Sequence, residues 1–174
     1  MTRTLDSAPG AALSALHGAQ FDHIGVVVKT LERGRAALSR SHGIQDWTAP
    51  LTDPLNGVHI LFGRDPSGVV YELLAPIDAS SPVQPALVAR KNLLNHIAYR
   101  VVDLAQARER MLAAGCAPTA DPKPALAFGG GLIQFFVTPL NIVIELIEAL
   151  HHEHRYVPTS VSDITVSNLE DCAP

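Results

Sequence analysis

The chain has 174 residues, of which 47% are hydrophobic and 17% charged, and its formal net charge at pH 7 is −4. This length fits one domain, or two small half-domains that share a core, and the composition is ordinary for a globular protein. A slightly acidic chain offers no basic surface for nucleic acid or anionic lipid, so we expect neither as a partner.

Cysteine usage and the N-terminal segment favour a cytoplasmic location. Cys116 and Cys172 lie far apart and lack metal-binding spacing, so a reducing compartment is the default expectation. Residues 1–19 are Ala-rich, but Asp6 and His17 interrupt any signal-like apolar run. No segment approaches the roughly 20 apolar residues of a membrane span. We therefore expect a cytoplasmic protein without membrane contact, whose residues 1–19 form a loose N-terminal extension.

The first half of the chain, residues 20–76, predicts one βαβββ module. β-Branched residues indicate a buried strand near its start, in which alternation places His23 on the same face as Gly25 and Val27. Thr30 is a good N-cap for the helix that follows. The predicted elements are a strand over 21–28, a helix over 30–41, an irregular strand or loop over 44–57, and hairpin strands over 58–62 and 69–74.

The second half of the chain, residues 94–149, repeats this pattern after a Pro-containing connection over 77–93. Asp103 is a good N-cap for the second module's helix, and Gly115 ends it. The predicted elements are a short helix over 83–89 in the connection, a strand over 94–102, and a hairpin of 132–137 with 142–147. The polar tail, residues 150–174, fits no element strongly, so we expect much of it to be poorly ordered.

Two His/Glu pairs repeat at an offset of 73 residues, which maps His23 onto His96 and Glu72 onto Glu145. A single histidine or glutamate in a strand is usually structural or faces solvent. Both glutamates, however, interrupt strands that are apolar on both faces, where an unpaired carboxylate is costly. Two imidazoles and two carboxylates suit Zn, Fe, Co, Ni or Mn, and an octahedral ion would keep two positions for water or substrate. We predict that these four residues bind one divalent metal ion.

Several motifs together resemble the vicinal oxygen chelate (glyoxalase) superfamily, particularly its methylmalonyl-CoA epimerase-like branch. They occupy residues 23–28 (HIGVVV), 72–76 (ELLAP), 81–83 (SPV), 94–98 (LNHIA), 102–103 (VD) and 145–148 (ELIE). The resemblance covers residues 20–149 and implies an α+β fold in which two tandem βαβββ modules form a cup-shaped mixed β-sheet with the helices outside. It implies one divalent metal ion held by the same four residues. It leaves open whether the chain works alone or as a homodimer.

The resemblance also implies a reaction on a small-molecule substrate: metal-dependent proton abstraction next to the carbonyl of a small acyl thioester or oxo acid, of epimerase or isomerase type. Epimerases of this branch carry a glutamate base where this chain has Leu55. We therefore expect Glu145 as the principal base and His59, rather than Asp53, as an auxiliary acid or base, because imidazole suits proton transfer near neutral pH. A glyoxalase-type lyase, and a small-molecule-binding or resistance protein without turnover, remain alternatives.

Two further polar residues are candidates for substrate binding. Arg100 shares the strand face of His96 and is expected to meet an anionic group of the substrate, with a position at the cup rim as the alternative. Gln134 interrupts an apolar strand and is expected to contact substrate if its face lines the cup, with a structural hydrogen bond as the alternative. Residues 151–154 (HHEH) are adjacent rather than spaced for one face, so we interpret them as solvated surface.

Overall fold

The computed structural model describes residues 14–91 and 93–157, and its elements follow the expected order. The first module contains β1 (Gln20–Val27), α1 (Leu31–His42), β2 (Asp46–Thr48), β3 (Leu51–Asp53), β4 (Val58–Arg64) and β5 (Val70–Pro76). The short helix α2 (Gln84–Ala89) lies in the connection. The second module contains β6 (Leu94–Arg100), α3 (Leu104–Ala113), β7 (Ala117–Pro118), β8 (Lys123–Pro124), η1 (Leu126–Phe128), β9 (Leu132–Val137) and β10 (Val143–Ile147), and β11 (Tyr156–Val157) follows it.

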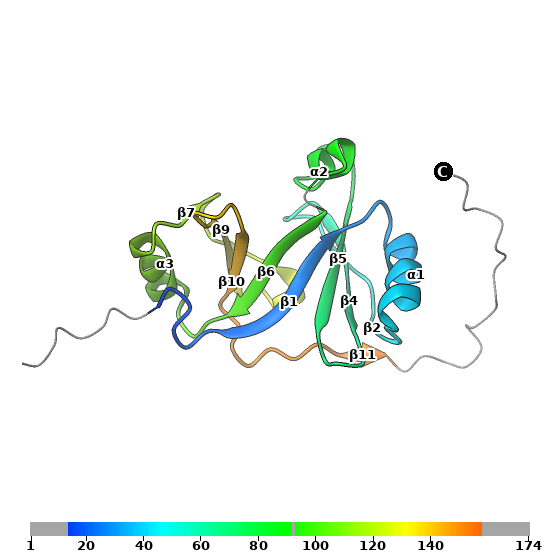
Figure 1. The fold of residues 1–174 in the computed structure, drawn as a ribbon, viewed down its shortest axis with the longest axis horizontal. Coiled ribbons are helices and arrows are strands. Elements are labelled where there is room, and N and C mark those ends of the chain that lie inside the picture. Colours follow the sequence, from blue (N-terminus) through cyan, green and yellow to red (C-terminus); the bar gives the residue numbers. More distant parts are fainter. Residues whose placement is uncertain (1–13, 92, 158–174) are drawn as a thin grey trace, which may run out of the picture.

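The strands form one mixed, curved sheet in the order β11-β2-β4-β5-β1-β6-β10-β9-β7, with β3 paired to β4 and β8 to β9. The two modules meet at its centre, where β1 and β6 run antiparallel. On either side, β5 runs parallel to β1 and β10 runs parallel to β6. Figure 1 shows the sheet curving between α1 at one end and α3 at the other. This is the expected α+β cup with its helices outside.

Polar caps determine where the two crossover helices begin. The Thr30 Oγ1 accepts the Arg33 N–H at 3.3 Å, and an Asp103 carboxylate oxygen accepts the Gln106 N–H at 2.9 Å. Gly43, with φ of 68°, ends α1 in the left-handed conformation that glycine adopts readily. The Thr30 and Asp103 caps were expected from the sequence, and each helix starts shortly after its module's first strand.

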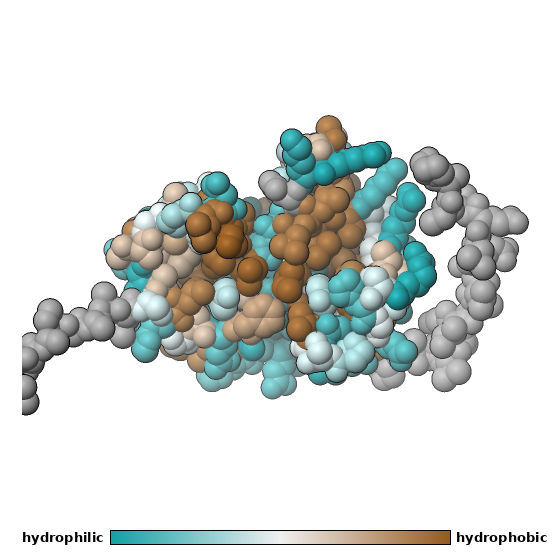
Figure 2. Space-filling model, in the orientation of Figure 1, coloured by the Kyte–Doolittle hydropathy of each residue, from teal (hydrophilic) through white to brown (hydrophobic). Residues whose placement is uncertain are grey.

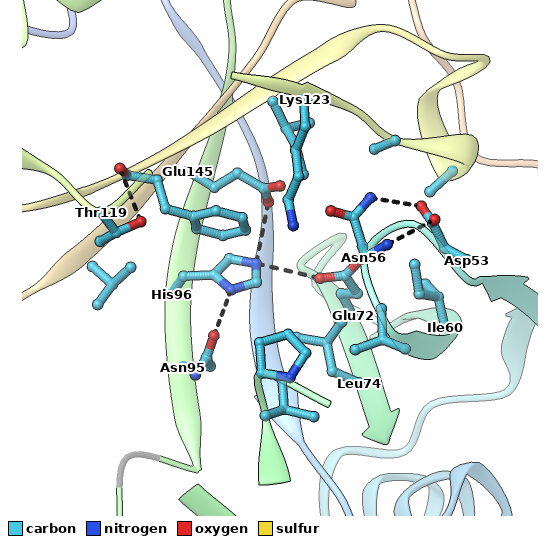
Figure 3. A pocket seen from close by; sticks show the side chains of 18 of the residues that line it. Asp53, Asn56, Ile60, Glu72, Leu74, Asn95, His96, Thr119, Lys123 and Glu145 are labelled. Carbon is cyan, nitrogen blue, oxygen red and sulfur yellow. Dashed lines mark hydrogen bonds and ion pairs between the residues drawn. The ribbon is translucent and has the colours of Figure 1, made fainter. Parts of the chain in front are cut away.

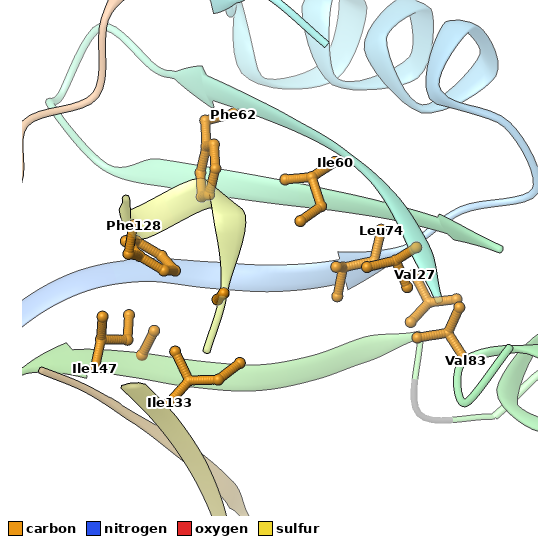
Figure 4. Packing of buried hydrophobic residues seen from close by; sticks show 11 residues of the cluster. Val27, Ile60, Phe62, Leu74, Val83, Phe128, Ile133 and Ile147 are labelled. Atoms are coloured by element: carbon orange, nitrogen blue, oxygen red, sulfur yellow. The ribbon is translucent and has the colours of Figure 1, made fainter. Parts of the chain in front are cut away.

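Apolar side chains pack on both faces of the sheet. On the outer face, Leu61 and Leu73 lie under α1, while Phe136 and Leu146 lie under α3. The concave face carries a separate cluster, drawn in Figure 4, whose labelled members are Val27, Ile60, Phe62, Leu74, Val83, Phe128, Ile133 and Ile147. Successive side chains of a strand point to opposite faces of the sheet. Because both faces are covered by apolar side chains, the strands are apolar at successive positions in the sequence.

A β-bulge in β1 brings two neighbouring polar residues into the core. Between the positions where Phe21 and Ile24 pair with β6, β1 has one residue more than its partner strand. Such an extra residue breaks the strict in-and-out alternation of side chains. As a result, Asp22 and His23 are both buried, with exposed fractions of 5% and 0%.

Both ends of the described chain are more closely packed than the sequence suggested. Residues 150–157, which we call the C-terminal strap, were expected to lack structure, yet they end in β11, which pairs with β2. At the other end, Ala15, Leu16 and Ala19 pack against the cluster under α3. The remaining parts of the predicted extension and tail, residues 1–13 and 158–174, lie outside the described residues.

The surface shows apolar side chains on one face of the molecule (Figure 2). Among the exposed residues, Val88 of α2 and Leu94 at the start of β6 have exposed fractions of 77% and 66%. The homodimer left open by the sequence stays a prediction. Within the described residues, no helix is long and apolar enough to cross a membrane.

Candidate metal centre and cavity

Four buried side chains from the four central strands converge on the concave face: His23 on β1, Glu72 on β5, His96 on β6 and Glu145 on β10. The two Nε2 atoms lie 3.0 Å apart. The Oε2 atom of Glu72 lies 3.2 and 3.3 Å from the Nε2 atoms of His23 and His96, and that of Glu145 lies 3.4 and 3.2 Å from them. The sequence-predicted quartet is thus one compact cluster.

The spacing of these donors fits a divalent metal ion. Nitrogen and carboxylate oxygen ligands lie about 2.1 Å from such an ion, so neighbouring ligands in octahedral or tetrahedral shells are separated by about 3.0–3.4 Å. The separations in the cluster, 3.0 to 3.4 Å, fall in this range. The cluster is therefore consistent with a metal site.

Hydrogen bonds behind the two histidines orient their donor atoms toward the cluster centre. The Nδ1 of His23 lies 2.7 Å from Asp22 Oδ2, and the Nδ1 of His96 lies 3.1 Å from Asn95 Oδ1. Because both acceptors are oxygens, each Nδ1 carries the proton and each neutral ring directs its Nε2 lone pair inward. Two facing lone pairs beside two carboxylates require a cation or protons between them. The donor set thus fits a metal ion on chemical grounds as well.

The charges within the cluster shift the pKa values of its members. Burial opposes protonation of His23, but the Glu72 carboxylate and the hydrogen bond to Asp22 outweigh it and raise the pKa of this imidazole well above its ordinary value. At His96, burial again lowers the pKa, but the Glu145 carboxylate outweighs this effect and raises the pKa of the imidazole. The imidazoles in turn hold the pKa of the Glu72 carboxyl well below its usual range, despite its burial. Without a metal, the cluster therefore retains protons near neutral pH.

Gly25 makes room for His96. The two residues pair across β1 and β6. A Cβ atom built on Gly25 would lie 2.2 Å from His96 Cε1 and 2.5 Å from both ring nitrogens. No larger residue fits at position 25 unless the imidazole leaves its place in the cluster.

The cluster opens onto a cavity of about 310 Å³ on the concave face (Figure 3). Glu72, His96 and Glu145 form its inner wall. Most of the remaining wall is apolar and includes Val58, Ile60, Leu74, Val83, Phe128, Ile133, Phe135 and Val143. A ligand in this cavity would therefore contact the cluster at one end and hydrocarbon around its sides.

A family model described as the glyoxalase/bleomycin resistance protein/dioxygenase superfamily matches residues 22–135. The chain belongs to this superfamily. A sequence relative, the ethylmalonyl-CoA/methylmalonyl-CoA epimerase of Cereibacter sphaeroides, is 29% identical over 119 residues, which cover 67% of this chain and 86% of the relative. The superfamily predicted from the sequence motifs is thereby confirmed.

Two solved structures share the fold of this chain. A hypothetical protein from Bacillus halodurans aligns with a TM-score of 0.67 and 21% identity, covering 79% of this chain and 99% of its own. A Streptomyces coelicolor methylmalonyl-CoA epimerase variant in complex with 2-nitronate-propionyl-CoA aligns with a TM-score of 0.62 and 20% identity, covering 83% and 100%. At these identities the likeness supports the fold alone.

His59, expected as an auxiliary acid or base, does not line the cavity. Its neighbours in β4, Val58 and Ile60, line the cavity, so alternation sends His59 to the outer face. There its Nδ1 lies 2.9 Å from the hydroxyl of Thr52 in the paired strand β3. His59 therefore cannot reach a molecule bound at the cluster without a rearrangement of the sheet.

Gln134 is likewise on the outer face, which corrects its expected role in substrate binding. Ile133 and Phe135, its neighbours in β9, line the cavity. The Gln134 side chain is buried, and its Nε2 donates to the Ala120 carbonyl at 2.8 Å. These contacts agree with the alternative expectation, that Gln134 makes a structural hydrogen bond.

Arg100 lies on the face expected from alternation, but it does not line the cavity next to the cluster. Its Nε lies 2.9 Å from Asp22 Oδ1. Its Nη1 donates to the carbonyls of Leu150 and His152 in the C-terminal strap. Arg100 therefore connects the strap to the carboxylate behind His23, in place of the expected contact with substrate.

His154, expected on the solvated surface, is a further strap residue and contacts Asp22. Its side chain is 9% exposed, and its Nε2 lies 3.0 Å from Asp22 Oδ2. Its ring centroid lies 4.2 Å from that of Phe62. Together with Arg100 and His23, His154 contacts the buried Asp22 carboxylate. The hydrogen bonds and charges of the two histidines outweigh burial and lower the pKa of this carboxyl.

The cavity also contains polar residues that the sequence did not single out. Lys123 of β8 and Asn56 from the turn after β3 also line it (Figure 3). The Asn56 side chain donates to Asp53 Oδ2 at 2.9 Å and to the Pro124 carbonyl at 3.1 Å. Lys123 lies in a Pro-rich segment without a strand pattern, so no sequence signal indicated that it reaches the cavity.

Proposed function

We propose that this chain is a metal-dependent enzyme that removes a proton next to the carbonyl of a small acyl thioester or oxo acid, in an epimerase- or isomerase-like reaction. One observation carries the proposal: three of the four clustered donors, Glu72, His96 and Glu145, line a largely apolar cavity. A structural metal site is normally closed by protein ligands, whereas a site open to a cavity leaves room for a substrate.

The role proposed for the metal is that of a Lewis acid, which would stabilise the negative charge that develops on the substrate carbonyl oxygen. His23, Glu72, His96 and Glu145 would hold it. Glu145 is also the proposed base. Its Oε2 is buried and accepts no hydrogen bond among the described residues, so its lone pairs stay available to a metal or a substrate proton.

The cavity dimensions favour a small acyl group. Small-molecule pockets span about 300–1,000 Å³, and this cavity, at about 310 Å³, lies at the lower end. The sequence relative is named an ethylmalonyl-CoA/methylmalonyl-CoA epimerase, and one structural relative holds 2-nitronate-propionyl-CoA. We infer that the acyl part of a thioester would occupy the cavity while any larger carrier stayed outside it.

One departure from the epimerase pattern supports a second candidate. Leu55, at the position of the epimerase glutamate, is apolar, and its side chain is 59% exposed. A glyoxalase-type lyase acting on a hemithioacetal is therefore kept as the alternative reaction. Its assay, the consumption of a methylglyoxal–thiol adduct, runs on the same metal-loaded protein.

The experiment combines metal analysis with isotope exchange. We expect purified protein to bind about one divalent ion per chain, and His96→Ala to lose most of it, whereas His17→Ala at an exposed position retains it. Metal-loaded protein should then incorporate deuterium from D₂O next to the carbonyl of methylmalonyl-CoA. Metal content that is equal in wild type and His96→Ala contradicts the site, and metal binding without exchange or lyase activity contradicts the enzyme.

A further inference from the structure

We propose that Lys123 is a specificity-determining residue, whose ammonium group pairs with a negatively charged group of the bound substrate and so selects substrates that carry a free carboxylate. This inference rests on the proposed function, in which a small acyl group or oxo acid occupies the cavity. It adds the charge of the substrate, which neither the cluster nor the apolar wall defines.

The backbone holds Lys123 on the cavity side of β8. Lys123 pairs with Ile133 of β9, and directly opposed residues of two strands share a face of the sheet. Ile133 lines the cavity, and so does Lys123. The next residue, Pro124, has a fixed φ, and its carbonyl accepts a hydrogen bond from the Asn56 side chain at 3.1 Å. The lysine side chain therefore starts from a well-held point on the cavity wall.

The Lys123 amine has no partner among the described residues. Figure 3 shows the side chain extending into the cavity, toward Glu145. Over residues 14–91 and 93–157, however, no carboxylate lies at ion-pair distance from this amine and no hydrogen bond engages it. The side chain is half-buried and enters a largely apolar cavity, where a charged group without a partner is costly. A bound anion would remove this cost.

The acidic residues that line the cavity are engaged elsewhere. Glu72 and Glu145 face the two imidazoles of the cluster, and a divalent ion there would balance their two charges. Asp53 is 0% exposed, and its two oxygens accept four hydrogen bonds. The donors are the backbone N–H groups of Leu55, Asn56 and Leu126 and the side-chain amide of Asn56. The ammonium of Lys123 is thus left for a ligand.

The position of this amine indicates which part of a substrate carries the charge. The cavity, at about 310 Å³, has room for a small acyl group but not for a large carrier. Because the amine points toward the cluster, an anion that it binds lies in the same small space as the reacting carbonyl. A carboxylate on the acyl group itself meets this requirement, and its oxygens accept strong, charge-assisted hydrogen bonds from an ammonium.

The test compares malonyl-CoA and acetyl-CoA, which differ by one carboxylate, in calorimetric titrations of the metal-loaded protein. Wild type should bind malonyl-CoA at least ~10-fold more tightly, as expected for one hydrogen bond between charged groups. Lys123→Met should lose this preference, while its affinity for acetyl-CoA stays that of wild type. Lys123→Arg retains the charge, so malonyl-CoA should remain the preferred ester. Lys29→Met, at an exposed lysine, should match wild type.

Three results would overturn the assignment. The first is a wild type that does not prefer malonyl-CoA. The second is a preference undiminished in Lys123→Met, which would mean that the metal alone selects the carboxylate. The third is an equal loss of affinity for both esters in Lys123→Met, which would mean that Lys123 binds the carrier or maintains the shape of the site.

Deuterium exchange into methylmalonyl-CoA tests the proposed function separately. If wild type catalyses exchange but any of these three results is found, the proposed function stands and only the assignment of Lys123 fails. If the preference depends on Lys123 but no exchange or lyase activity is found, the anion site stands and the enzyme is contradicted. A wild type that neither binds the esters nor catalyses exchange overturns both.

Discussion

At the scale of single residues, the chemistry of the cluster depends on what lies directly behind each donor. Asp22 and Asn95 fix the orientation of the two imidazoles, and Gly25 leaves the space that His96 occupies. Their effect on a bound metal ion would be exerted through the histidines, and outer residues of this kind are usually worth about 10–100-fold in metal affinity.

Gly25→Ala is expected to remove the metal without unfolding the chain. The new methyl group would overlap the His96 ring, so the imidazole must leave the cluster. We expect metal affinity to fall by at least ~10-fold, measured by competition with a fluorescent chelator. Gly43→Ala is the control: it places a side chain at a φ of 68° and should cost about 1 kcal/mol of stability with no change in metal affinity.

Metal uptake is expected to release protons. The pKa values of His23 and His96 are raised, so at pH 7 the metal-free cluster retains protons that a metal ion must displace. Metal affinity should therefore fall as the pH drops below these raised pKa values. Calorimetric titrations in buffers of different ionisation enthalpy measure the released protons, and an apparent enthalpy independent of the buffer would contradict the expectation.

At the scale of elements, the C-terminal strap has a larger role than its sequence indicates. It crosses the end of the sheet, pairs through β11 with β2, and places His154 against Asp22. Arg100 contacts the strap and Asp22 at the same time. The strap therefore closes the side of the cluster that lies away from the cavity.

Arg100→Ala is expected to reduce stability, which reverses the expectation from the sequence that it would affect substrate binding alone. The variant leaves the buried Asp22 carboxylate without its guanidinium, and breaking a buried ion pair costs on the order of 3 kcal/mol. Urea denaturation measures the change. Arg108→Ala, which removes an exposed pair with Glu109, should cost less than about 1 kcal/mol. A similar loss in both variants would show that Arg100 contributes no more than a surface charge.

The sequence predicted the helices, the main hairpins and the converging quartet because each depends on local patterns or on the repeat. It could not tell which face of β4 or β9 is concave, since both faces are covered by apolar side chains, and His59 and Gln134 were misplaced for that reason. Nor could it reveal the bulge that buries Asp22 beside His23, because strict alternation sends adjacent residues to opposite faces. The ordered structure of the strap was also not predictable, because it arises from contacts with Asp22 and β2, which are distant from the strap in the sequence.

At the scale of the whole molecule, the cluster joins the two modules, because each contributes one histidine and one glutamate. A metal ion bound by all four residues would favour the state in which β1 and β6 are paired. With free metal at about 1,000 times its dissociation constant, binding adds about 4 kcal/mol of stability, which raises the melting temperature by roughly 10 °C in a chain of this size.

Removing the metal with a chelator should therefore lower the melting temperature by that amount, measured by differential scanning calorimetry. His23→Ala should melt at a temperature independent of added metal. A melting temperature of the wild-type protein that does not change with metal or chelator would mean that the modules associate without help from the cluster.

Asp22 and Asn95 occupy matching places in the two halves of the duplicated chain, yet one is charged and the other neutral. A carboxylate makes its imidazole a stronger electron donor than an amide does. If the two halves were identical, the centre would have twofold symmetry, and a ligand could bind to it in either of two equivalent orientations. At this pair of positions the two halves of the chain differ. The two imidazoles are therefore unequal donors, and the two orientations of a ligand at the centre are not equivalent.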